Sequence, residues 1–284
     1  MGLFDGCTAL VTGGGTGIGR GCARRLLEQG ARVTLAARRL DVLEGAAEEL
    51  RVQVRGAKVS VAKCDVTVEK EVEAAVRMAA DATGRLDIAV ANAGCGVPGP
   101  ILALKSVHWR FANDLNILGT ALTIKHAGLA MKARGGSIVA ISSVNGVMVS
   151  KYMAPYSVSK AGLEMLVRCA AIELAPFRIR VNCIQPGYVP TEGTQMAYEA
   201  SEIHELLEKT PLERPGHPEE IGDGVVYFSA PSGAWVTGQV LAIDGGMSIS
   251  LGESVERLCR TLHGNALMDE CVGPSKDREA DSAS

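Results

Sequence analysis

Seven short apolar runs alternate along this chain with longer segments of helical period. Near-continuous apolarity is what a strand needs when both faces of its sheet are covered. The predicted strands are 8–12, 32–37, 58–64, 86–92, 136–142, 179–184 and 239–244. The predicted helices between them include 18–29, 39–50, 67–82, 108–134, 156–175 and 217–230. This alternation predicts an α/β fold with a doubly wound parallel sheet of about seven strands and helices on both faces.

The pattern changes after residue 250. A further helix is predicted over 253–268, with an apolar face formed by Val255, Leu258, Cys259 and Leu262. The last stretch, "GPSKDREADSAS", is polar and rich in small residues, and we expect it to be mobile. The chain is therefore expected to form one domain over 1–251 and a tail over 252–284.

Composition excludes several kinds of partner. A formal net charge of −3 gives no basic surface for nucleic acid or an acidic membrane. No apolar run reaches the roughly 18 residues needed to span a bilayer, and the N-terminal sequence does not resemble a secretion signal. The eight cysteines form no CxxC pair and no cluster with the five histidines, so no metal site is expected. We expect a cytoplasmic protein that acts on a small molecule.

The first predicted strand runs into the stretch "TGGGTGIG" at 12–19. Glycines at such a turn let backbone N–H groups approach a pyrophosphate at the N-terminus of the next helix. The context supports this interpretation, because an apolar strand precedes the stretch and an amphipathic helix follows it. The stretch predicts a dinucleotide-binding turn. The alternative is a glycine-rich turn that binds nothing.

The end of the second predicted strand indicates which dinucleotide is bound. NAD sites usually carry an acidic residue about 20 residues beyond the glycine turn, where it binds the ribose hydroxyls. Ala37 stands at that place here, followed by Arg38 and Arg39. A guanidinium binds a 2′-phosphate by charge-assisted hydrogen bonds, whereas a carboxylate repels it. NADP(H) is therefore expected, with Arg38 as its first-choice ligand. The alternative is two solvated arginines, with Asp41 as the ribose ligand.

Further short motifs follow in a fixed order. They are "CDV" (64–66), "NAG" (92–94), "DLN" (114–116), "SS" (142–143), "YSVSK" (156–160), "NCIQPG" (182–187) and "DGG" (244–246). With the glycine turn they give residues 5–250 a clear resemblance to the short-chain dehydrogenase/reductase family, the compact one-domain kind similar to 3-oxoacyl reductases. Each motif is weak alone, but the ordered set is highly specific. The resemblance implies a Rossmann-like fold and a homotetramer or homodimer.

The resemblance also implies roles for residues at matching positions. The implied catalytic residues are Asn116, Ser143, Tyr156 and Lys160. Together with the turn and the two arginines, the expected cofactor-binding residues are Gly13, Gly15, Thr16, Gly17, Ile18, Gly19, Arg38, Arg39, Asp65, Val66, Asn92, Ala93, Gly94, Tyr156, Lys160, Pro186, Gly187, Val189 and Thr191. Ser143 is preferred to Ser142 because family members usually have the serine thirteen residues before the tyrosine.

These residue types suit carbonyl chemistry. Hydride transfer to a carbonyl leaves negative charge on oxygen, so a proton must arrive in step. The pKa of an unperturbed tyrosine is about 10, and a nearby ammonium lowers it. Tyr156 and Lys160, four residues apart on a helix, can come within reach. Ser143 is expected to orient the substrate oxygen. Asn116 is expected to hold a water that relays protons to Lys160, the alternative being an ordinary core amide.

Substrate is expected beyond the carboxyl ends of the strands, between segments 94–101, 144–153 and 188–210. Residues 193–210 have helical character and are expected to form a lid or a rigid surface helix. The expected lining is mostly apolar: Val144, Met148, Val149, Met153, Tyr188, Met196 and Tyr198. The expected function is NADP(H)-dependent interconversion of a carbonyl and a secondary alcohol. The alternatives are reduction of an activated C=C bond, as in an enoyl reductase, and a non-catalytic NADP(H)-binding regulator.

Overall fold

A parallel seven-stranded sheet organises the chain. The structure is a computed structural model that describes residues 2–81, 84–192, 200–250 and 256–272. The strand order is β3-β2-β1-β4-β5-β6-β7, and every neighbouring pair is parallel. The strands are β1 (Thr8–Thr12), β2 (Arg32–Ala37), β3 (Lys58–Lys63), β4 (Ile88–Ala91), β5 (Gly136–Ile141), β6 (Ile179–Pro186) and β7 (Val240–Ile243). The predicted α/β class is confirmed, with all seven strands within a few residues of their expected bounds.

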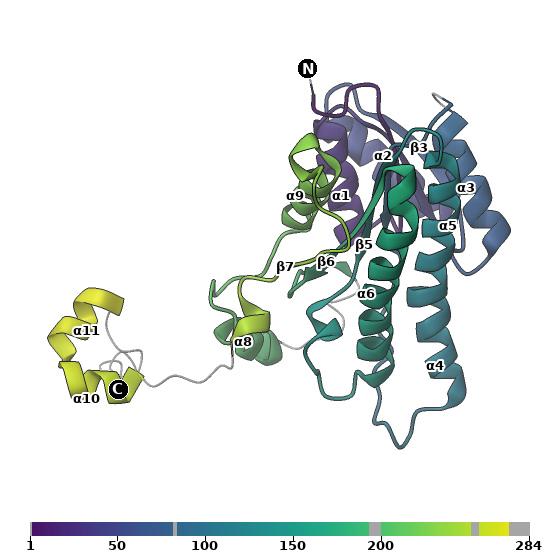
Figure 1. Ribbon diagram of the computed structural model, residues 1–284. Coiled ribbons are helices and arrows are strands. Elements are labelled where there is room, and N and C mark those ends of the chain that lie inside the picture. The colour runs from purple at the N-terminus through teal and green to yellow at the C-terminus, as the bar shows by residue number, and fades with distance from the viewer. Residues whose placement is uncertain (1, 82–83, 193–199, 251–255, 273–284) are drawn as a thin grey trace. The chain divides into compact units, whose positions relative to one another are not determined.

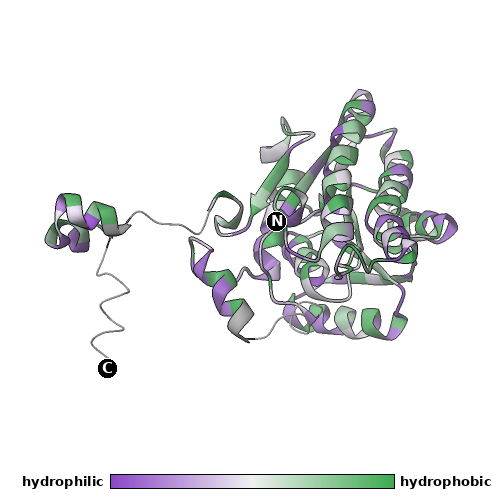
Figure 2. Cartoon of the chain, turned by 90° about the horizontal axis from the view of Figure 1, so that it is seen from below, coloured by the Kyte–Doolittle hydropathy of each residue, from purple (hydrophilic) through white to green (hydrophobic). Residues whose placement is uncertain are grey.

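Helices cover both faces of the sheet (Figure 1). On one face pack α1 (Gly17–Glu28), α2 (Leu40–Gln53) and α9 (Pro218–Ser229). On the other pack α3 (Glu69–Asp81), α5 (Gly119–Met131) and α6 (Ala154–Leu174). A hydrophobic core lies between the sheet and each layer of helices. In β1, Ala9 and Val11 point into the core under α1, α2 and α9, whereas Leu10 points into the core under α3, α5 and α6. The helices alternate between green and purple in Figure 2, as amphipathic helices packed on such a sheet do.

The long helix predicted over 108–134 is not regular. It consists of α4 (Ser106–Asn113), a π-helical turn η1 (Asp114–Leu118) and α5. A π-helical turn accommodates one extra residue and is frequent at functional sites. The Thr120 hydroxyl donates to the carbonyl oxygen of Asn116 at 2.8 Å, which satisfies a carbonyl in the widened turn. The prediction of one uninterrupted α-helix is therefore wrong at Asn116.

The chain divides into two compact units, residues 1–249 and 250–284. The second unit contains two short helices, α10 (Glu256–His263) and α11 (Asn265–Val272), instead of the single helix expected over 253–268. Gly264 separates them with a φ of +83°, a left-handed conformation that glycine adopts readily. An ion pair between Arg260 and Asp269 joins the two helices. Val255 and residues 273–284 lie outside the described residues.

Segment 193–210 is described only in part. Helix α8 (Ala200–Glu208) falls within it. Residues 193–199, which include Met196 and Tyr198, lie outside the described residues.

Among the helices of the described ranges, none has an apolar stretch sufficient to span a bilayer. The same ranges contain no group of three or more residues able to hold a metal ion.

Helices α1 and α9 cross at unusually close range. A Cβ atom added to Gly21 would lie 2.5 Å from the carbonyl carbon of Pro218, and one added to Gly222 would lie 2.7 Å from Cγ of Arg25. Real Cβ atoms do not approach backbone so closely, so any side chain at Gly21 would force the helices apart. This contact fixes the helix that begins at the glycine-rich turn.

We predict that Gly21→Ala lowers the free energy of unfolding by about 1–3 kcal/mol, because the overpacked helices must separate. Gly45→Ala is the matched control, since Gly45 lies in α2 with no atom within 4 Å of the added Cβ. That control is expected to raise the free energy by about 0.5–1 kcal/mol. Urea denaturation of both variants measures the difference. Equal effects of the two substitutions would contradict the packing argument.

Candidate active site

The turn between β1 and α1 is built from glycines that have little room for a side chain. Gly13 has a φ of +64° and Gly17 a φ of +48°. A Cβ atom on Gly19 would lie 2.2 Å from the Gly13 carbonyl oxygen. A tight turn of this shape leaves the N-terminus of α1 open to close approach by a ligand. Sequence analysis predicted this arrangement from the glycines together with the apolar strand before them and the amphipathic helix after them.

Side chains bind this turn to the end of β4. The Thr12 hydroxyl accepts hydrogen bonds from the backbone N–H groups of Asn92 at 3.0 Å and Ala93 at 3.2 Å. The Asn92 amide donates to the carbonyl oxygens of Thr12 at 3.0 Å and Gly13 at 3.2 Å. Asn92 therefore acts by shaping the turn. Thr12 was not among the predicted residues, although a hydroxyl residue at the end of the first strand is a visible signal.

A groove opens beside the turn, along the carboxyl ends of β1, β2 and β4. It is lined by Gly13, Gly15, Thr16, Ala36, Ala37, Arg38, Arg39, Val42, Cys64, Asp65, Val66, Ala93, Gly94, Cys95 and Leu115. The groove thus brings together predicted residues from four separate segments. Of the other predicted residues near the turn, Gly17 and Gly19 are buried and Ile18 is partly buried in α1.

Two arginines and one carboxylate set the charge at the mouth of the groove. Arg38 and Arg39 are exposed, and within the described part of the chain neither guanidinium forms an ion pair. Burial alone would raise the pKa of Asp65, but two hydrogen bonds from Thr67 and the charge of Arg38 outweigh it and lower that pKa. Arg38 therefore acts on the same end of the groove as Asp65.

The loop after β6 lies over the opposite side of the glycine turn. Thr191 packs so closely on Gly17 that a Cβ there would lie 2.7 Å from its Cγ2 atom. Gly187 donates its N–H to the Ile243 carbonyl at 3.1 Å and has no room for a side chain against Asp244. Val189 is buried. Of the predicted set, Thr191 and Val189 thus lie toward α1, whereas Pro186 and Gly187 lie against the end of β7. None of the four lines the groove that holds Arg38.

Ser143, Tyr156 and Lys160 meet where β5 gives way to α6. Ser143 precedes the short turn η2 (Val144–Gly146), and Tyr156 lies in the first turn of α6. The Ser143 hydroxyl lies close enough to the Tyr156 hydroxyl to lower its pKa, and both side chains remain partly accessible. Lys160 is only 4% exposed, donates from Nζ to the Ile141 carbonyl at 2.8 Å, and lies 5.6 Å from the centre of the Tyr156 ring.

Asn116 joins this group from the π-helical turn. Its amide nitrogen donates to the Cys95 carbonyl at 3.0 Å and to the Ser159 hydroxyl at 2.8 Å, while its oxygen accepts from Cys95 N at 3.0 Å. A Cβ on Gly94 would lie 2.8 Å from that oxygen and 3.3 Å from Lys160 Nζ. Asn116 thus holds the loop after β4 against α6. The "NAG" loop and all four predicted catalytic residues lie together.

Burial dominates the electrostatics of the pair. Desolvation lowers the pKa of Lys160 to about 8, against smaller opposing effects of Cys183, Cys95 and Glu164. The pKa of Tyr156 is raised by burial, and its hydrogen bond with Ser143 acts in the opposite direction. Sequence analysis expected the ammonium to lower the pKa of Tyr156. In the structure the tyrosine pKa is raised instead, because desolvation of the phenolate is the largest effect.

Comparison with known proteins identifies the family. A family model described as enoyl-(acyl carrier protein) reductase matches residues 13–248. Cis-4-hydroxycyclohexanecarboxylate dehydrogenase of Sinomonas cyclohexanicum is 36% identical over 244 residues, which cover 84% of this chain and 95% of that protein. A short-chain type dehydrogenase/reductase from Mycobacterium marinum is 35% identical with a TM-score of 0.81, covering 86% of this chain and 96% of that one. The chain belongs to the short-chain dehydrogenase/reductase family.

A further solved structure shows what one relative binds. It is a 7α-hydroxysteroid dehydrogenase complexed with NADH and 7-oxo glycochenodeoxycholic acid, 31% identical with a TM-score of 0.83, covering 89% of this chain and 97% of that one. Short-chain dehydrogenases/reductases are oxidoreductases that use a nicotinamide cofactor. The fold and family of this chain are therefore those predicted from its motifs.

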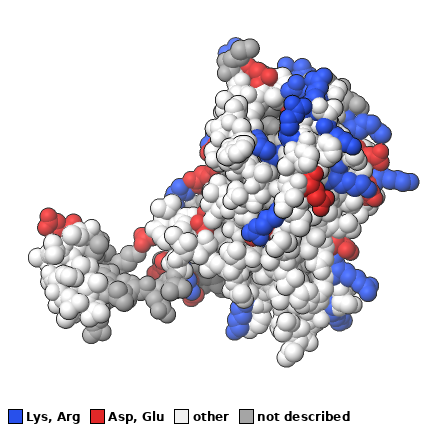
Figure 3. All heavy atoms as spheres, viewed as in Figure 1, with Lys and Arg blue, Asp and Glu red and all other residues white. Residues whose placement is uncertain are grey.

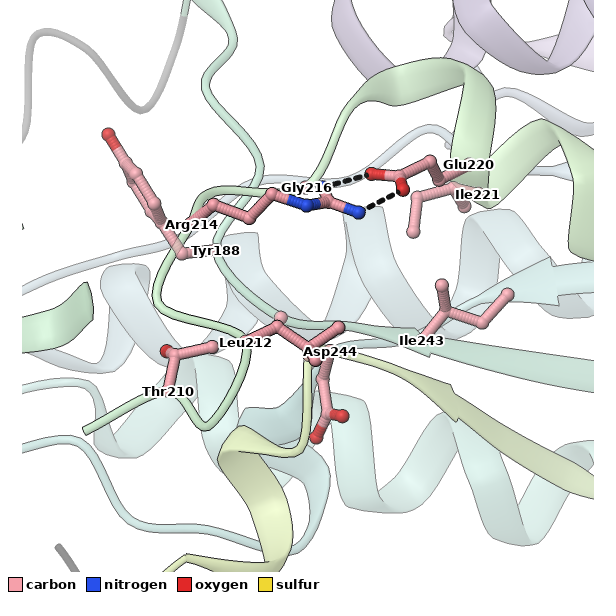
Figure 4. Close-up of a pocket in the computed structure, with 11 residues that line it drawn as sticks. Tyr188, Thr210, Leu212, Arg214, Gly216, Glu220, Ile221, Ile243 and Asp244 are labelled. Carbon is pink, nitrogen blue, oxygen red and sulfur yellow. Dashed lines mark hydrogen bonds and ion pairs between the residues drawn. The ribbon is translucent and has the colours of Figure 1, made fainter. Parts of the chain in front are cut away.

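Outside the groove, this short-chain dehydrogenase/reductase has a second hollow where β6 and β7 end (Figure 4). It is lined by Gly187, Tyr188, Thr210, Leu212, Arg214, Gly216, Glu220, Ile221, Ile243, Asp244 and Gly245. The Arg214 guanidinium pairs with both oxygens of Glu220, at 2.6 and 2.9 Å. Hydrogen bonds from Arg214 lower the pKa of Glu220 to about 2. This pair fixes the loop between α8 and α9 beside Tyr188.

The expected substrate walls meet in the described segments. The Gly99 N–H donates to the Tyr152 carbonyl at 2.8 Å, which joins the loop after β4 to the loop before α6. A Cβ on Gly96 would lie 2.8 Å from Cε of Met153. Val149 is 92% exposed, whereas Val144 is buried and belongs to the core. The apolar lining of the substrate pocket therefore stays a prediction for Met148, Val149 and Met153.

Lys160 yields a prediction that links stability to pH. Its pKa is about 8 in the folded state and about 10.4 when unfolded, so folding disfavours the ammonium. The full free-energy cost of burying the ammonium is present below pH 8, and it disappears as the pH rises toward the pKa of the unfolded state. Lys160→Met should therefore raise the free energy of unfolding at pH 7 by about 1–3 kcal/mol, with a smaller gain near pH 10.

Urea denaturation at pH 7 and pH 10 measures this change. Lys70→Met is the control, because Lys70 is exposed on α3 and its substitution should leave the unfolding free energy within about 0.5 kcal/mol. A loss of stability in Lys160→Met at pH 7 would show that the hydrogen bond to Ile141 outweighs the desolvation cost.

Proposed function

We propose that this chain is an NADP(H)-dependent oxidoreductase that interconverts a carbonyl and a secondary alcohol. The observation that supports this best is the meeting of Ser143 and Tyr156, both partly accessible, with the buried Lys160 and Asn116. They lie at the carboxyl ends of the strands, where ligands of open α/β sheets bind. Residues 1–251 would form the catalytic domain and 252–284 the tail.

The residues present fit a nicotinamide dinucleotide. The turn around Gly13, Gly17 and Gly19 has no side chain that would block the N-terminus of α1. Gly15, Thr16, Asp65 and Val66 line the adjoining groove, and Ala93 and Gly94 extend it toward Lys160. When bound, the cofactor supplies or accepts the hydride. Pro186, Gly187, Val189 and Thr191 are proposed to hold its nicotinamide end.

Each catalytic residue has one role in this proposal. Tyr156 gives a proton to the carbonyl oxygen in reduction and takes it back in oxidation. Ser143 orients the same oxygen and stabilises the charge that develops on it. The Lys160 ammonium favours the phenolate of Tyr156 after proton transfer and donates to the cofactor ribose. Asn116 holds the loop after β4 against α6 through its hydrogen bonds to Cys95 and Ser159. It remains our choice for the residue that holds a water relaying protons to Lys160.

The 2′-phosphate is the basis for choosing NADP(H). Ala37 stands where NAD sites usually carry an acid, and the exposed Arg38 and Arg39 flank the groove. A guanidinium with no carboxylate partner among the described residues is available for a phosphate. NAD(H) is the alternative, since the 7α-hydroxysteroid dehydrogenase structure contains NADH.

The substrate class is inferred from the relatives and from the apolar residues that are expected to line the pocket. One relative acts on a hydroxycyclohexanecarboxylate and another on a hydroxysteroid, both with the hydroxyl on a saturated ring. Val149 and Met153 offer apolar contacts of the kind such rings need. An alicyclic ketone or alcohol is therefore our first choice. An enoyl thioester is the second, because the matching family model is described as an enoyl reductase.

A cytoplasmic homotetramer or homodimer is proposed as the working form. Helices α4, α5 and α6 expose apolar side chains, among them Phe111, Leu129, Met165 and Ile172. Figure 3 shows few charged side chains on the lower part of the face that carries these helices. Burial of such a surface against a second copy would stabilise an assembly.

The first test is turnover with NADPH across a panel of substituted cyclohexanones, oxosteroids, 3-oxoacyl thioesters and enoyl thioesters. We predict turnover of ring ketones, and a fall in kcat of about 10²- to 10⁴-fold in Tyr156→Phe with NADPH binding retained. Tyr227→Phe is the control and should match the wild type, because the Tyr227 side chain is exposed on α9. Turnover of enoyl thioesters alone would favour the C=C reductase, and cofactor binding without turnover would favour the regulator.

Cofactor choice has its own test. Arg38→Gln should weaken NADPH binding by about tenfold or more and leave NADH binding unchanged, because a charge-assisted hydrogen bond to the 2′-phosphate is lost. Arg55→Gln, another exposed arginine, is the control. Fluorescence titration at fixed ionic strength gives both dissociation constants. Wild-type preference for NADH would overturn the NADP(H) assignment and point to Asp41 as the ribose ligand.

A further inference from the structure

Glu164 is a buried carboxylate directly behind the candidate catalytic pair. It is 3% exposed and lies on α6 one turn beyond Lys160. Residues 156, 160 and 164 are spaced by four, so all three share one face of the helix. A buried carboxylate is costly unless it is hydrogen-bonded, and the mechanism above gives this one no role. Its partners therefore indicate what it does.

Three other elements surround the carboxylate. Ser142, at the end of β5, donates from its hydroxyl to Glu164 Oε1 at 2.8 Å, and Gln185 on β6 donates from Nε2 to the same atom at 2.7 Å. In η2, a Cβ atom on Gly146 would lie only 2.2 Å from Oε1. The carboxylate thus fills the space beneath the turn that follows Ser143.

These contacts bear on the position of Ser143. The residue before it, Ser142, is bound to α6 through Glu164, and Ile141 is bound to α6 through Lys160 Nζ at 2.8 Å. The end of β5 is therefore attached to α6 at two successive residues. The distance between Ser143 and Tyr156 depends on both attachments. Ser142 is used in this way, which leaves Ser143 as the serine that faces Tyr156.

The charge of Glu164 bears on Lys160. The titratable groups that face the ammonium are Tyr156 and Glu164 on its own helix, Cys95 on the loop after β4 and Cys183 on β6. Burial raises the pKa of both thiols, so they are neutral near pH 7. Glu164 is the carboxylate among these groups. Burial lowers the pKa of Lys160 to about 8, and Cys183, Cys95 and, least of the three, Glu164 act against that change.

We propose that Glu164 is a positioning residue of this site: its carboxylate fixes the Ser143 turn against α6 and stabilises the Lys160 ammonium one helical turn away. The proposal rests on the proposed function for its effect on turnover, but its effect on Lys160 does not require turnover. Sequence analysis missed Glu164, although an acid at the third position of the series 156, 160, 164 is a visible signal.

Two substitutions separate charge from position. Glu164→Gln keeps the shape and the acceptor oxygen but removes the charge, so the alkaline limb of kcat/KM should move down by about one pH unit. Glu164→Asp keeps the charge but is too short to reach Ser142 and Gln185. The value of kcat should therefore fall about tenfold, while the alkaline limb of kcat/KM stays at the same pH. Glu173→Gln, exposed near the end of the same helix, is the control and should match the wild type.

The experiment measures NADPH binding by fluorescence and turnover of the accepted ketone, both from pH 6 to pH 10. In Glu164→Gln the alkaline midpoint of NADPH binding should fall together with that of kcat/KM. Wild-type turnover of no carbonyl would contradict the proposed function, while the binding midpoints would still test Glu164. Equal binding midpoints in wild type and Glu164→Gln would overturn the proposed electrostatic role.

A second variant covers the case in which Glu164→Gln does not fold. Gly146→Ala places a Cβ against Oε1 and should displace the carboxylate, lowering kcat about tenfold. In a Glu164→Ala background, Gly146→Ala should lower kcat much less, because the space that the carboxylate occupied is then empty. If Gly146→Ala lowers kcat by the same factor in both backgrounds, the positioning role of Glu164 is overturned.

Discussion

The site depends on the contacts of one buried group, the ammonium of Lys160. It is almost fully buried, and the Ile141 carbonyl gives it a partner at the end of β5. It also lies against Gly94, so the loop after β4, the end of β5 and helix α6 meet at one atom. A charge in such surroundings is costly, and it is retained only where several neighbours are arranged to receive it. The glycine at 94 and the carboxylate at 164 are two of those neighbours.

Local pattern was enough to predict most of the framework. A strand covered on both faces must be apolar along its whole length, so the inner strands β1, β2, β4, β5 and β6 could be read from their own residues. The edge strands β3 and β7 are more exposed and were predicted from their place in the alternation of strands and helices. The ordered motifs then indicated which residues share the carboxyl edge, because the edge of a parallel sheet collects the residues that follow each strand. This is why Ser143, Tyr156 and Lys160 could be named from sequence and lie together in the structure.

Features that depend on contacts between distant segments could not be predicted in this way. The π-helical turn at Asn116 accompanies contacts with Cys95 and Ser159, one on another loop and one on another helix. The direction of the Tyr156 pKa depends on burial, which a spacing of four residues does not reveal. The break at Gly264 is different, since a glycine within a helical pattern is a local signal that could have been used.

The close crossing of α1 and α9 has a consequence for the order in which the chain folds. The two helices meet through Gly21 and Gly222, roughly 200 residues apart in the sequence. At about 5–20 residues per second, the ribosome needs on the order of 10–40 s to supply α9 after α1 has emerged. During that interval the apolar face of α1 lacks its final partner. The glycine-rich turn therefore takes its final support only when synthesis of the domain is almost complete.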